Sequence, residues 1–200
     1  MPFPPGRDRF DQARLINIAN VLTAMRVLLV PLFAYLLISD KEREALLVFV
    51  ICGATDGLDG LLARWLRQRT LVGAYLDPIA DKLLMATSFI VLAYVKIVPN
   101  WLAILVISRD IFILVGSFLY LALLEPTDIR PTLLSKMNTA MQVLTVTYFL
   151  AAAAFPELAA GAGAGEGTTL SRGMILLCSA TTAASGLQYL FLGLRKLSDV

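Results

Sequence analysis

Six long apolar stretches constrain this chain more than any other feature of its sequence. They cover residues 21–39, 45–66, 71–95, 101–123, 133–155 and 171–194. A helix needs about 20 mostly apolar residues to cross a bilayer. Of the 200 residues, 58% are hydrophobic and only 16% are charged, a composition too apolar for a water-soluble core. We therefore predict an all-α polytopic membrane protein, with six transmembrane helices forming one domain over residues 21–197.

The segment before the first apolar stretch has a different pattern. Phe10, Ala13 and Ile16 fall near one side of a helix, with arginines among the polar positions. Such an amphipathic helix lies on a membrane surface rather than across it. We expect residues 1–20 to form this N-terminal interfacial segment.

Lysines and arginines predict the orientation, because cytoplasmic loops carry more of them. With the N-terminus in the cytoplasm, that side collects Arg7, Arg9, Arg14, Arg64, Arg67, Arg69, Arg130, Lys136, Arg195 and Lys196. The other side collects Lys41, Arg43, Lys96 and Arg172. The asymmetry favours cytoplasmic termini in an inner- or plasma-membrane protein.

Several kinds of chemistry are excluded by composition. The sequence contains no histidine, so it cannot build a Ser-His-Asp or Cys-His nucleophile or a histidine zinc site. The two cysteines, Cys52 and Cys178, lie apart in apolar stretches and predict no disulfide scaffold. The glycine-rich stretch within 156–169 lacks the Lys-Ser/Thr end of a phosphate-binding loop, and we expect a flexible loop there.

Four aspartates interrupt the second and third apolar stretches. Asp56 and Asp59 are three residues apart, and Asp77 and Asp81 are four apart, so each pair lies on one face of its helix. A charge at the bilayer centre costs about 2.5–3.5 kcal/mol and usually serves function. Because the link at 67–70 is short, we expect antiparallel helices whose carboxylates converge near the cytoplasmic side. Such a cluster suits hard divalent cations, Mg²⁺, Mn²⁺ or Ca²⁺, and two ions would neutralise it.

Other interpretations of the aspartates remain open. They could be neutralised by Arg64, Lys82 and Arg109 without any metal. They could also form the transport site of a cation transporter or channel, although a fixed Arg64 contributes nothing to a cation path. A non-catalytic scaffold is a third possibility, which the complete set of four aspartates disfavours.

The residues between the aspartates form a longer motif. It reads Asp56-Gly-Leu-Asp59-Gly60-Leu-Leu-Ala63-Arg64, then Gly73 after eight residues, then Asp77 and Asp81. The pattern D-x2-D-G-x2-A-R-x8-G-x3-D-x3-D is matched at every position. The chain thus resembles the CDP-alcohol phosphatidyltransferase family, whose members are six-helix membrane enzymes with this motif on helices two and three.

The resemblance implies an activity and a site. Family members transfer a phosphatidyl group from CDP-diacylglycerol to an alcohol and release CMP. By resemblance, Asp56, Asp59, Asp77 and Asp81 hold two divalent ions, Mg²⁺ or Mn²⁺, and Asp81 is also the general base. The same resemblance implies CDP contacts from Asp56, Gly60, Ala63, Arg64, Gly73 and Asp77. It further implies a homodimer among membrane lipids, with no nucleic-acid partner.

Alternatives exist for the smaller motif residues. Gly60, Ala63 and Gly73 could simply allow close helix packing, because small residues are common at membrane helix contacts. Arg64 could be a positively charged membrane anchor rather than a phosphate ligand. Within the complete motif, we favour nucleotide contact.

Two further runs bear on the acceptor alcohol. They read Ile107-Ser108-Arg109-Asp110 and Ser135-Lys136-Met137-Asn138-Thr139, and they resemble runs in glycerophosphate-type family members. Phosphatidylglycerophosphate synthases typically have a second lysine where this chain has Asn138. The singly charged phosphatidylglycerol needs fewer cations than glycerol 3-phosphate. The pattern therefore looks more like the cardiolipin synthase branch, with phosphatidylglycerol as acceptor, and glycerol 3-phosphate is the alternative.

We predict that Arg109, Lys136 and Asn138 bind the acceptor. For Arg109 and Lys136 the alternative is a salt bridge to Asp110 or anchoring to lipid headgroups. Near the N-terminus, Asn20, Thr23 and Arg26 recur at three-residue spacing on one helix face. We interpret Asn20 and Thr23 as structural and Arg26 as a weaker functional candidate.

Overall fold

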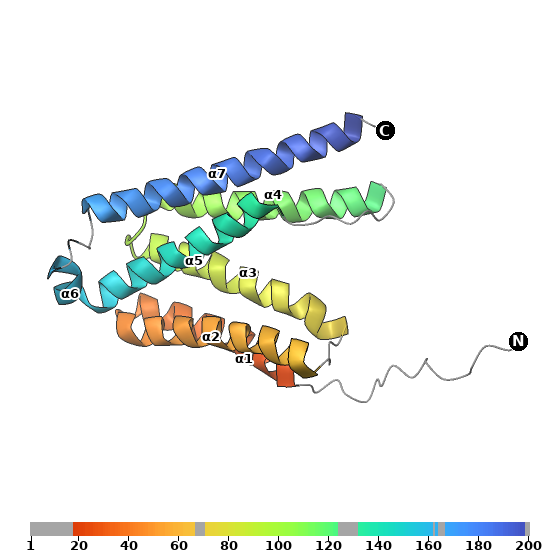
Figure 1. The fold of residues 1–200 in the computed structure, drawn as a ribbon. Helices are drawn as coiled ribbons and strands as arrows, with labels where there is room; N and C mark the ends of the chain where they lie inside the picture. The colour runs from red at the N-terminus through yellow and green to blue at the C-terminus, as the bar shows by residue number, and fades with distance from the viewer. Residues whose placement is uncertain (1–17, 67–70, 124–131, 162, 164–166, 199–200) are drawn as a thin grey trace, which may run out of the picture.

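The computed structural model is helical throughout the residues that it describes. It describes the chain except residues 1–17, 67–70, 124–131, 162, 164–166 and 199–200, and it excludes the side chains of 18–22, 56–78, 117–123 and 193–198. Within this part the elements are α1 (Ile18–Ile38), α2 (Glu42–Leu66), α3 (Leu71–Tyr94), α4 (Asn100–Leu123), α5 (Leu133–Ala154), α6 (Pro156–Gly161) and α7 (Thr169–Ser198). Figure 1 shows their arrangement.

The six long helices coincide with the six apolar stretches, with ends that differ by at most four residues. Among the described residues, Thr169–Leu192 in α7 is long and apolar enough to cross a membrane, and Thr23–Ile38 is a shorter apolar helix. The all-helical prediction is confirmed, whereas six membrane crossings stay a prediction. The predicted surface segment lies outside the described residues, except that residues 18–20 belong to α1.

The short helix α6 corrects one expectation. We expected a flexible loop over 156–169, but its first six residues are helical. Pro156 suits the first position of a helix, where its missing N–H is not needed. Glu157 places a negative charge at the positive end of the helix dipole, and Ala159 is buried. The glycines that predicted the loop begin only where α6 ends.

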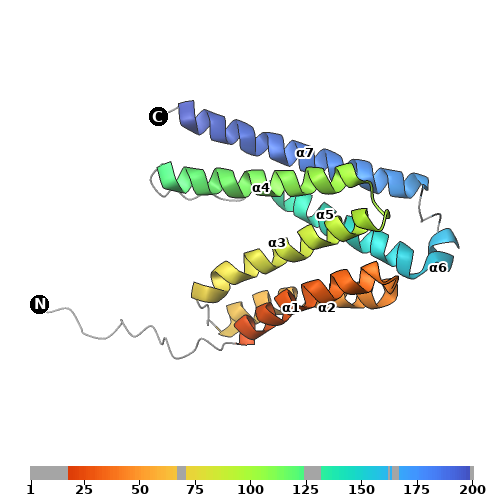
Figure 2. The same cartoon turned by 180° about the vertical axis from the view of Figure 1, so that it is seen from behind.

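Helix α5 joins the two sides of the bundle. Helices α1 and α2 lie on one side of α3, and α4 and α7 lie on the other, as both views show (Figures 1 and 2). Helix α5 contacts α2, α3 and α7, while α1 packs against α2 and α3. Arg43 at the start of α2 donates from Nε to the carbonyl oxygen of Ala154, 3.0 Å away, at the end of α5. Its guanidinium also lies 5.4 Å from the ring centre of Phe155.

Apolar side chains lie both inside the bundle and on its surface. The core includes Phe33, Phe89 and Leu92, each fully buried. Large apolar side chains are also exposed, such as Leu28 at 72% and Phe191 at 70%. Extensive exposed apolar surface is rare on soluble monomers, and it suits contact with lipid.

Buried polar residues occur in the same bundle. Those that the structure describes are Thr23, Arg26, Ser88, Arg109, Asn138, Gln142, Thr145, Ser171, Thr182 and Ser185. Ionisable residues within membrane helices usually face the bundle interior and mark functional sites. Two of these residues, Arg26 and Arg109, are arginines, and they lead to the candidate site.

Candidate functional site

The aspartate motif lies where α2 ends and α3 begins. Asp56 and Asp59 belong to α2, and Asp77 and Asp81 to α3. The helical backbone keeps each pair on one face, as its spacing predicts. Of the motif side chains, only that of Asp81 is described. The placement of the other predicted nucleotide and metal ligands, Asp56, Asp59, Gly60, Ala63, Arg64, Gly73 and Asp77, lies outside the described side chains and stays a prediction.

Asp81 is paired with an arginine from another helix. Nη1 of Arg26 on α1 donates to Oδ1 of Asp81 on α3 at 2.7 Å. The side chain of Arg26 is 1% exposed, whereas that of Asp81 is 44% exposed. A buried arginine requires a counter-charge, and this ion pair supplies one. Asp81 is therefore held in place by Arg26 while nearly half of its side chain stays accessible.

The two described cations that we considered as partners of the aspartates pair elsewhere. Nζ of Lys82 lies 3.0 Å from Oδ2 of Asp110, and Nη1 of Arg109 lies 2.8 Å from Oδ1 of the same carboxylate. Lys82 and Arg109 thus pair with Asp110 rather than with Asp81, while the pairing of Arg64 lies outside the described side chains. Among the described side chains, Arg26 is the arginine that contacts a motif aspartate, and the sequence had indicated it only as a weaker candidate.

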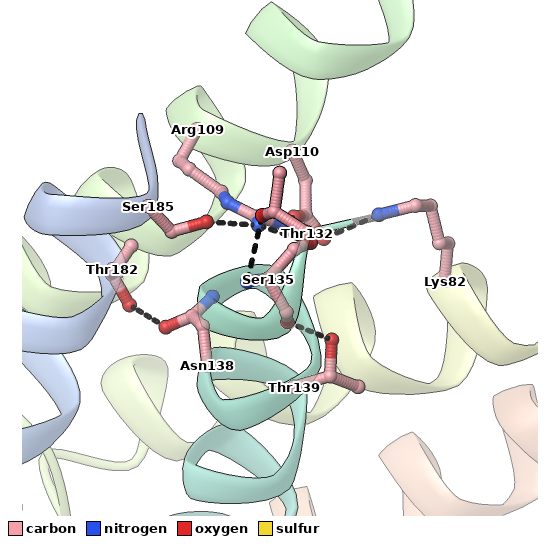
Figure 3. Close-up of polar contacts among 9 residues, drawn as sticks. All are labelled: Lys82, Arg109, Asp110, Thr132, Ser135, Asn138, Thr139, Thr182 and Ser185. Atoms are coloured by element: carbon pink, nitrogen blue, oxygen red, sulfur yellow. Dashed lines mark hydrogen bonds and ion pairs between the residues drawn. The ribbon is translucent and has the colours of Figure 1, made fainter. Parts of the chain in front are cut away.

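Arg109 is the centre of a second group of polar residues, shown in Figure 3. Its Nη2 donates to Oγ of Ser135 at 2.9 Å and to Oγ of Ser185. Nearby, Oγ1 of Thr182 donates to Oδ1 of Asn138 at 2.9 Å. We call this group the polar cluster, and it consists of Lys82, Arg109, Asp110, Ser135, Asn138, Thr182 and Ser185. It joins α3, α4, α5 and α7.

Local sequence explains how α5 contributes to the polar cluster. Thr132 is the N-cap of α5, and its side chain accepts a hydrogen bond from the backbone N–H of Ser135. Oγ1 of Thr132 also donates to the side-chain oxygen of Gln188 on α7 at 2.9 Å. The cap fixes the first turn of α5. Ser135 and Asn138, three residues apart, then lie on one face of the helix.

Three buried donors in this region have no hydrogen-bond partner within the described part of the chain. They are Nε of Arg109, Nδ2 of Asn138 and Nε2 of Gln142. Asn138 is completely buried, and Gln142 is 2% exposed. Buried polar groups are normally hydrogen-bonded, so unpaired ones require an explanation. A bound molecule with several acceptor oxygens would satisfy these donors.

The predicted acceptor residues thus differ in position. Arg109 and Asn138 belong to the polar cluster. Lys136 is exposed and makes none of the cluster's hydrogen bonds or ion pairs in the described contacts. The salt bridge to Asp110 that we weighed as an alternative for Arg109 is present, but it occupies only Nη1.

Sequence reasoning missed the contribution of α7. Thr182, Ser185 and Gln188 recur at three-residue spacing in an otherwise apolar stretch. That spacing places them on one helix face and could have indicated a polar interface. Nothing in the sequence indicated that this face meets α4 and α5.

The residue types of the motif fit a divalent metal ion. Carboxylate oxygens are the ligands that Mg²⁺ and Mn²⁺ prefer, and Asp81 is accessible enough to coordinate one. Within the described residues, no three potential metal ligands lie together, and three of the four predicted ligands fall outside that search.

Comparison with known proteins identifies the class. The profile of the CDP-alcohol phosphatidyltransferase family matches residues 16–184, which include the whole motif, Arg26 and every residue of the polar cluster except Ser185. The chain therefore belongs to the CDP-alcohol phosphatidyltransferase family.

Relatives of two kinds are similar to the chain. A probable cardiolipin synthase (CMP-forming) from Drosophila melanogaster is 33% identical over 92% of this chain and 61% of its own length. A human cardiolipin synthase (CMP-forming) is 36% identical over 70% of this chain and 52% of its own length. A probable phosphatidylglycerophosphate synthase from Mycobacterium tuberculosis is 33% identical over 70% of this chain and 68% of its own length. The chain thus spans little more than half the length of the first two relatives.

Proposed function

We propose that this protein transfers the phosphatidyl group of CDP-diacylglycerol to a glycerol-type acceptor and releases CMP. The observation that carries the proposal is the complete eight-residue motif, in a chain of this family, with Asp81 fixed by Arg26 beside the polar cluster. The names of the similar proteins support the same reaction. Family membership favours this activity over the cation transporter.

The reaction assigns a task to each group. The acceptor hydroxyl oxygen attacks the phosphatidyl phosphorus, the bond from that phosphorus to the CMP oxygen breaks, and the hydroxyl proton passes to Asp81. Asp81 would act as the general base that accepts this proton. Arg64 would bind the diphosphate, and Gly60, Ala63 and Gly73 would let the nucleotide approach the backbone. Two Mg²⁺ or Mn²⁺ ions, held by Asp56, Asp59, Asp77 and Asp81, would neutralise the diphosphate.

The charge of the polar cluster supports phosphatidylglycerol as the acceptor. Lys82 and Arg109 contribute two positive charges and Asp110 one negative charge, which leaves one net positive charge. The phosphodiester of phosphatidylglycerol carries one negative charge, whereas glycerol 3-phosphate carries about two. A neutral Asn138 within the cluster keeps this balance. The similarity to a phosphatidylglycerophosphate synthase supports glycerol 3-phosphate as the second candidate.

The proposed setting is an inner or plasma membrane. The exposed apolar side chains and the apolar length of α7 support insertion. The excess of lysine and arginine near one end supports cytoplasmic termini and a cytoplasmic active site. A homodimer is proposed from the family resemblance alone.

An acceptor assay tests the function. Purified protein is incubated with radiolabelled CDP-diacylglycerol and, in parallel, phosphatidylglycerol, glycerol 3-phosphate, inositol phosphate or serine. We expect labelled cardiolipin and CMP with phosphatidylglycerol. Labelled phosphatidylglycerophosphate would select the second candidate, and absence of CMP release with every acceptor would contradict the proposal.

Metal removal tests the cofactor separately. We expect EDTA to abolish CMP release and added Mg²⁺ or Mn²⁺ to restore it. Binding of Mn²⁺, followed by electron paramagnetic resonance, should weaken at least tenfold in Asp81→Asn. Full activity in EDTA would contradict the metal assignment without contradicting the transfer reaction.

A further inference from the structure

A cleft opens at the end of the bundle away from Asp81 and the polar cluster. Its volume is about 530 Å³, and it lies between the α3–α4 connection, the start of α7 and Phe149 near the end of α5. Ser135 of the polar cluster and Phe149 are 14 residues apart on α5, which corresponds to about 21 Å along the helix. The cleft is therefore separate from the proposed active site.

Two cations line the cleft. Lys96 and Arg172 are both exposed lining residues, and neither forms an ion pair with any residue in the described part of the chain. The sequence leaves only four cations near this end, and the other two lie elsewhere. Arg43 caps α5, and Lys41 is not among the lining residues. Two positive charges without an ion-pair partner among the described residues thus line one cleft.

The backbone at Lys96 is unfavourable for a lysine. The backbone N–H of Ile97 donates to the carbonyl of Leu92, and that of Lys96 donates to the carbonyl of Ala93. This pattern is a Schellman motif, in which the left-handed residue is usually glycine. Lys96 occupies that position with φ of 67°. A left-handed conformation costs an L-residue about 1–2 kcal/mol, so the lysine side chain is retained at a cost to stability.

The remaining lining residues give the cleft an amphipathic character. Phe149 and Ile175 provide apolar walls, Trp101 is half exposed, and the hydroxyl of Ser171 adds a polar group. Tryptophan is enriched where a membrane protein meets the headgroup region. Lysine and arginine side chains bind phosphate oxygens through charge-assisted hydrogen bonds. A volume of this size is typical of a small-molecule site.

We propose that this cleft binds the phosphate of an anionic phospholipid from the leaflet opposite the active site. The phosphodiester lies between Lys96 and Arg172, and the glycerol and upper acyl atoms lie against Phe149, Ile175 and Trp101. The site is separate from the transferase reaction and does not depend on it.

Fluorescence of Trp101 provides the test. The chain has two tryptophans, so Trp65→Phe leaves Trp101 as the reporter. This variant is placed in vesicles of phosphatidylcholine with increasing amounts of acyl-brominated phosphatidylglycerol, or of brominated phosphatidylcholine as the zwitterionic reference. We expect brominated phosphatidylglycerol to quench at a clearly lower mole fraction.

Charge variants then locate the binding. Lys96→Gly and Arg172→Gln should each reduce the preference for phosphatidylglycerol about fivefold, because each cation near an anionic lipid is worth that factor. Lys96→Gly should also melt at or above the temperature of the parent, since glycine relieves the left-handed residue. Lys41→Gln is the control, because it removes one positive charge at the same end of the bundle but outside the cleft. It should leave the preference for phosphatidylglycerol within twofold of the parent value.

Several results would overturn the proposal. Equal quenching by both lipids would show that the cleft does not select an anionic phospholipid. If Lys41→Gln lowered the preference as much as Lys96→Gly and Arg172→Gln do, the preference would reflect the total positive charge of this surface rather than binding in the cleft. Protection of Trp101 by millimolar inorganic phosphate would make free phosphate, rather than lipid, the ligand. Loss of the preference in Asp81→Asn would assign the lipid to the active site instead.

Discussion

The two ends of the bundle are built from the same helices but from opposite kinds of side chain. On α5, Asn138 and Gln142 are buried near one end, whereas Phe149 and Leu150 are buried near the other. On α1, Arg26 precedes the apolar core residues in the same way. Both helices change from buried polar to buried apolar side chains along their length.

Helices α3 and α4 show the same change, with α4 in the reverse chain direction. Helix α3 runs from Asp81 and Lys82 to Phe89, while α4 runs from Leu102 to Arg109. The apolar end gains stability from close packing, and the polar end holds charges that are costly in a membrane. Together with the proposed function, this difference assigns helix packing mainly to one end and the chemistry to the other. Four substitutions test this division, in order of their expected effect on turnover.

The largest effect is expected from Asp81→Asn. Asparagine can still accept the hydrogen bond from Arg26 but cannot accept the proton, so CMP release should fall by about 10²–10⁴-fold. The melting temperature should also fall, because asparagine removes the counter-charge that Asp81 gives the buried Arg26, so the rate is compared at equal amounts of folded protein. Asp40→Asn is the matched control, since Asp40 is exposed near the apolar end with φ of 56°, which asparagine tolerates. Substantial activity in Asp81→Asn would contradict the assignment of the chemistry to the polar end.

A smaller effect is expected from Arg109→Gln. The loss of a charged hydrogen-bond donor costs about 1.5–3 kcal/mol, so the KM for phosphatidylglycerol should rise about 10- to 100-fold. The KM for CDP-diacylglycerol should stay within about threefold. Steady-state CMP release at varied acceptor concentrations measures both. Equal rises in the two KM values would indicate a general loss of structure at the polar end.

A third substitution, Asn138→Ala, removes one unpaired donor and one neutral hydrogen bond. Because such a bond contributes about 1 kcal/mol, the acceptor KM should rise about fivefold. Lys136→Gln on the same helix is the control and should change it by less than about threefold, since exposed charges contribute little. A larger rise in the acceptor KM for Lys136→Gln than for Asn138→Ala would indicate that the acceptor binds at the exposed surface of α5 rather than at the polar cluster.

The smallest effect on turnover is expected from Phe33→Ala. Phe33 is fully buried at the apolar end, and its ring centre lies 6.0 Å from that of Phe49. Its truncation should lower stability by about 3–5 kcal/mol, visible as a lower melting temperature, while kcat of the folded protein stays within about twofold. Phe33→Leu should retain most of the stability. A large loss of kcat at full folding would contradict the division.

The sequence predicted the helices well because a membrane-length apolar stretch restricts a chain to few structures. It missed α6, because glycines farther along dominated the composition of that loop. Arg109 and Asn138 could be predicted as site residues from the sequence, because a polar residue within an apolar stretch is conspicuous. The Arg26–Asp81 pair could not be predicted, since 55 residues separate its members and only the packing of α1 on α3 brings them together. Thr182 and Ser185 were missed for the same reason.

The position of α5 has a consequence for how the protein is made. Helices α1–α3 emerge from the ribosome before α5, which contacts α2 and α3, and Arg43 meets its carbonyl partner 111 residues later. Domains generally acquire structure in the order of synthesis. The first three helices must therefore persist as an incomplete assembly until α5 arrives. Nonsense mutations before α5 should therefore yield fragments that are degraded rather than stored.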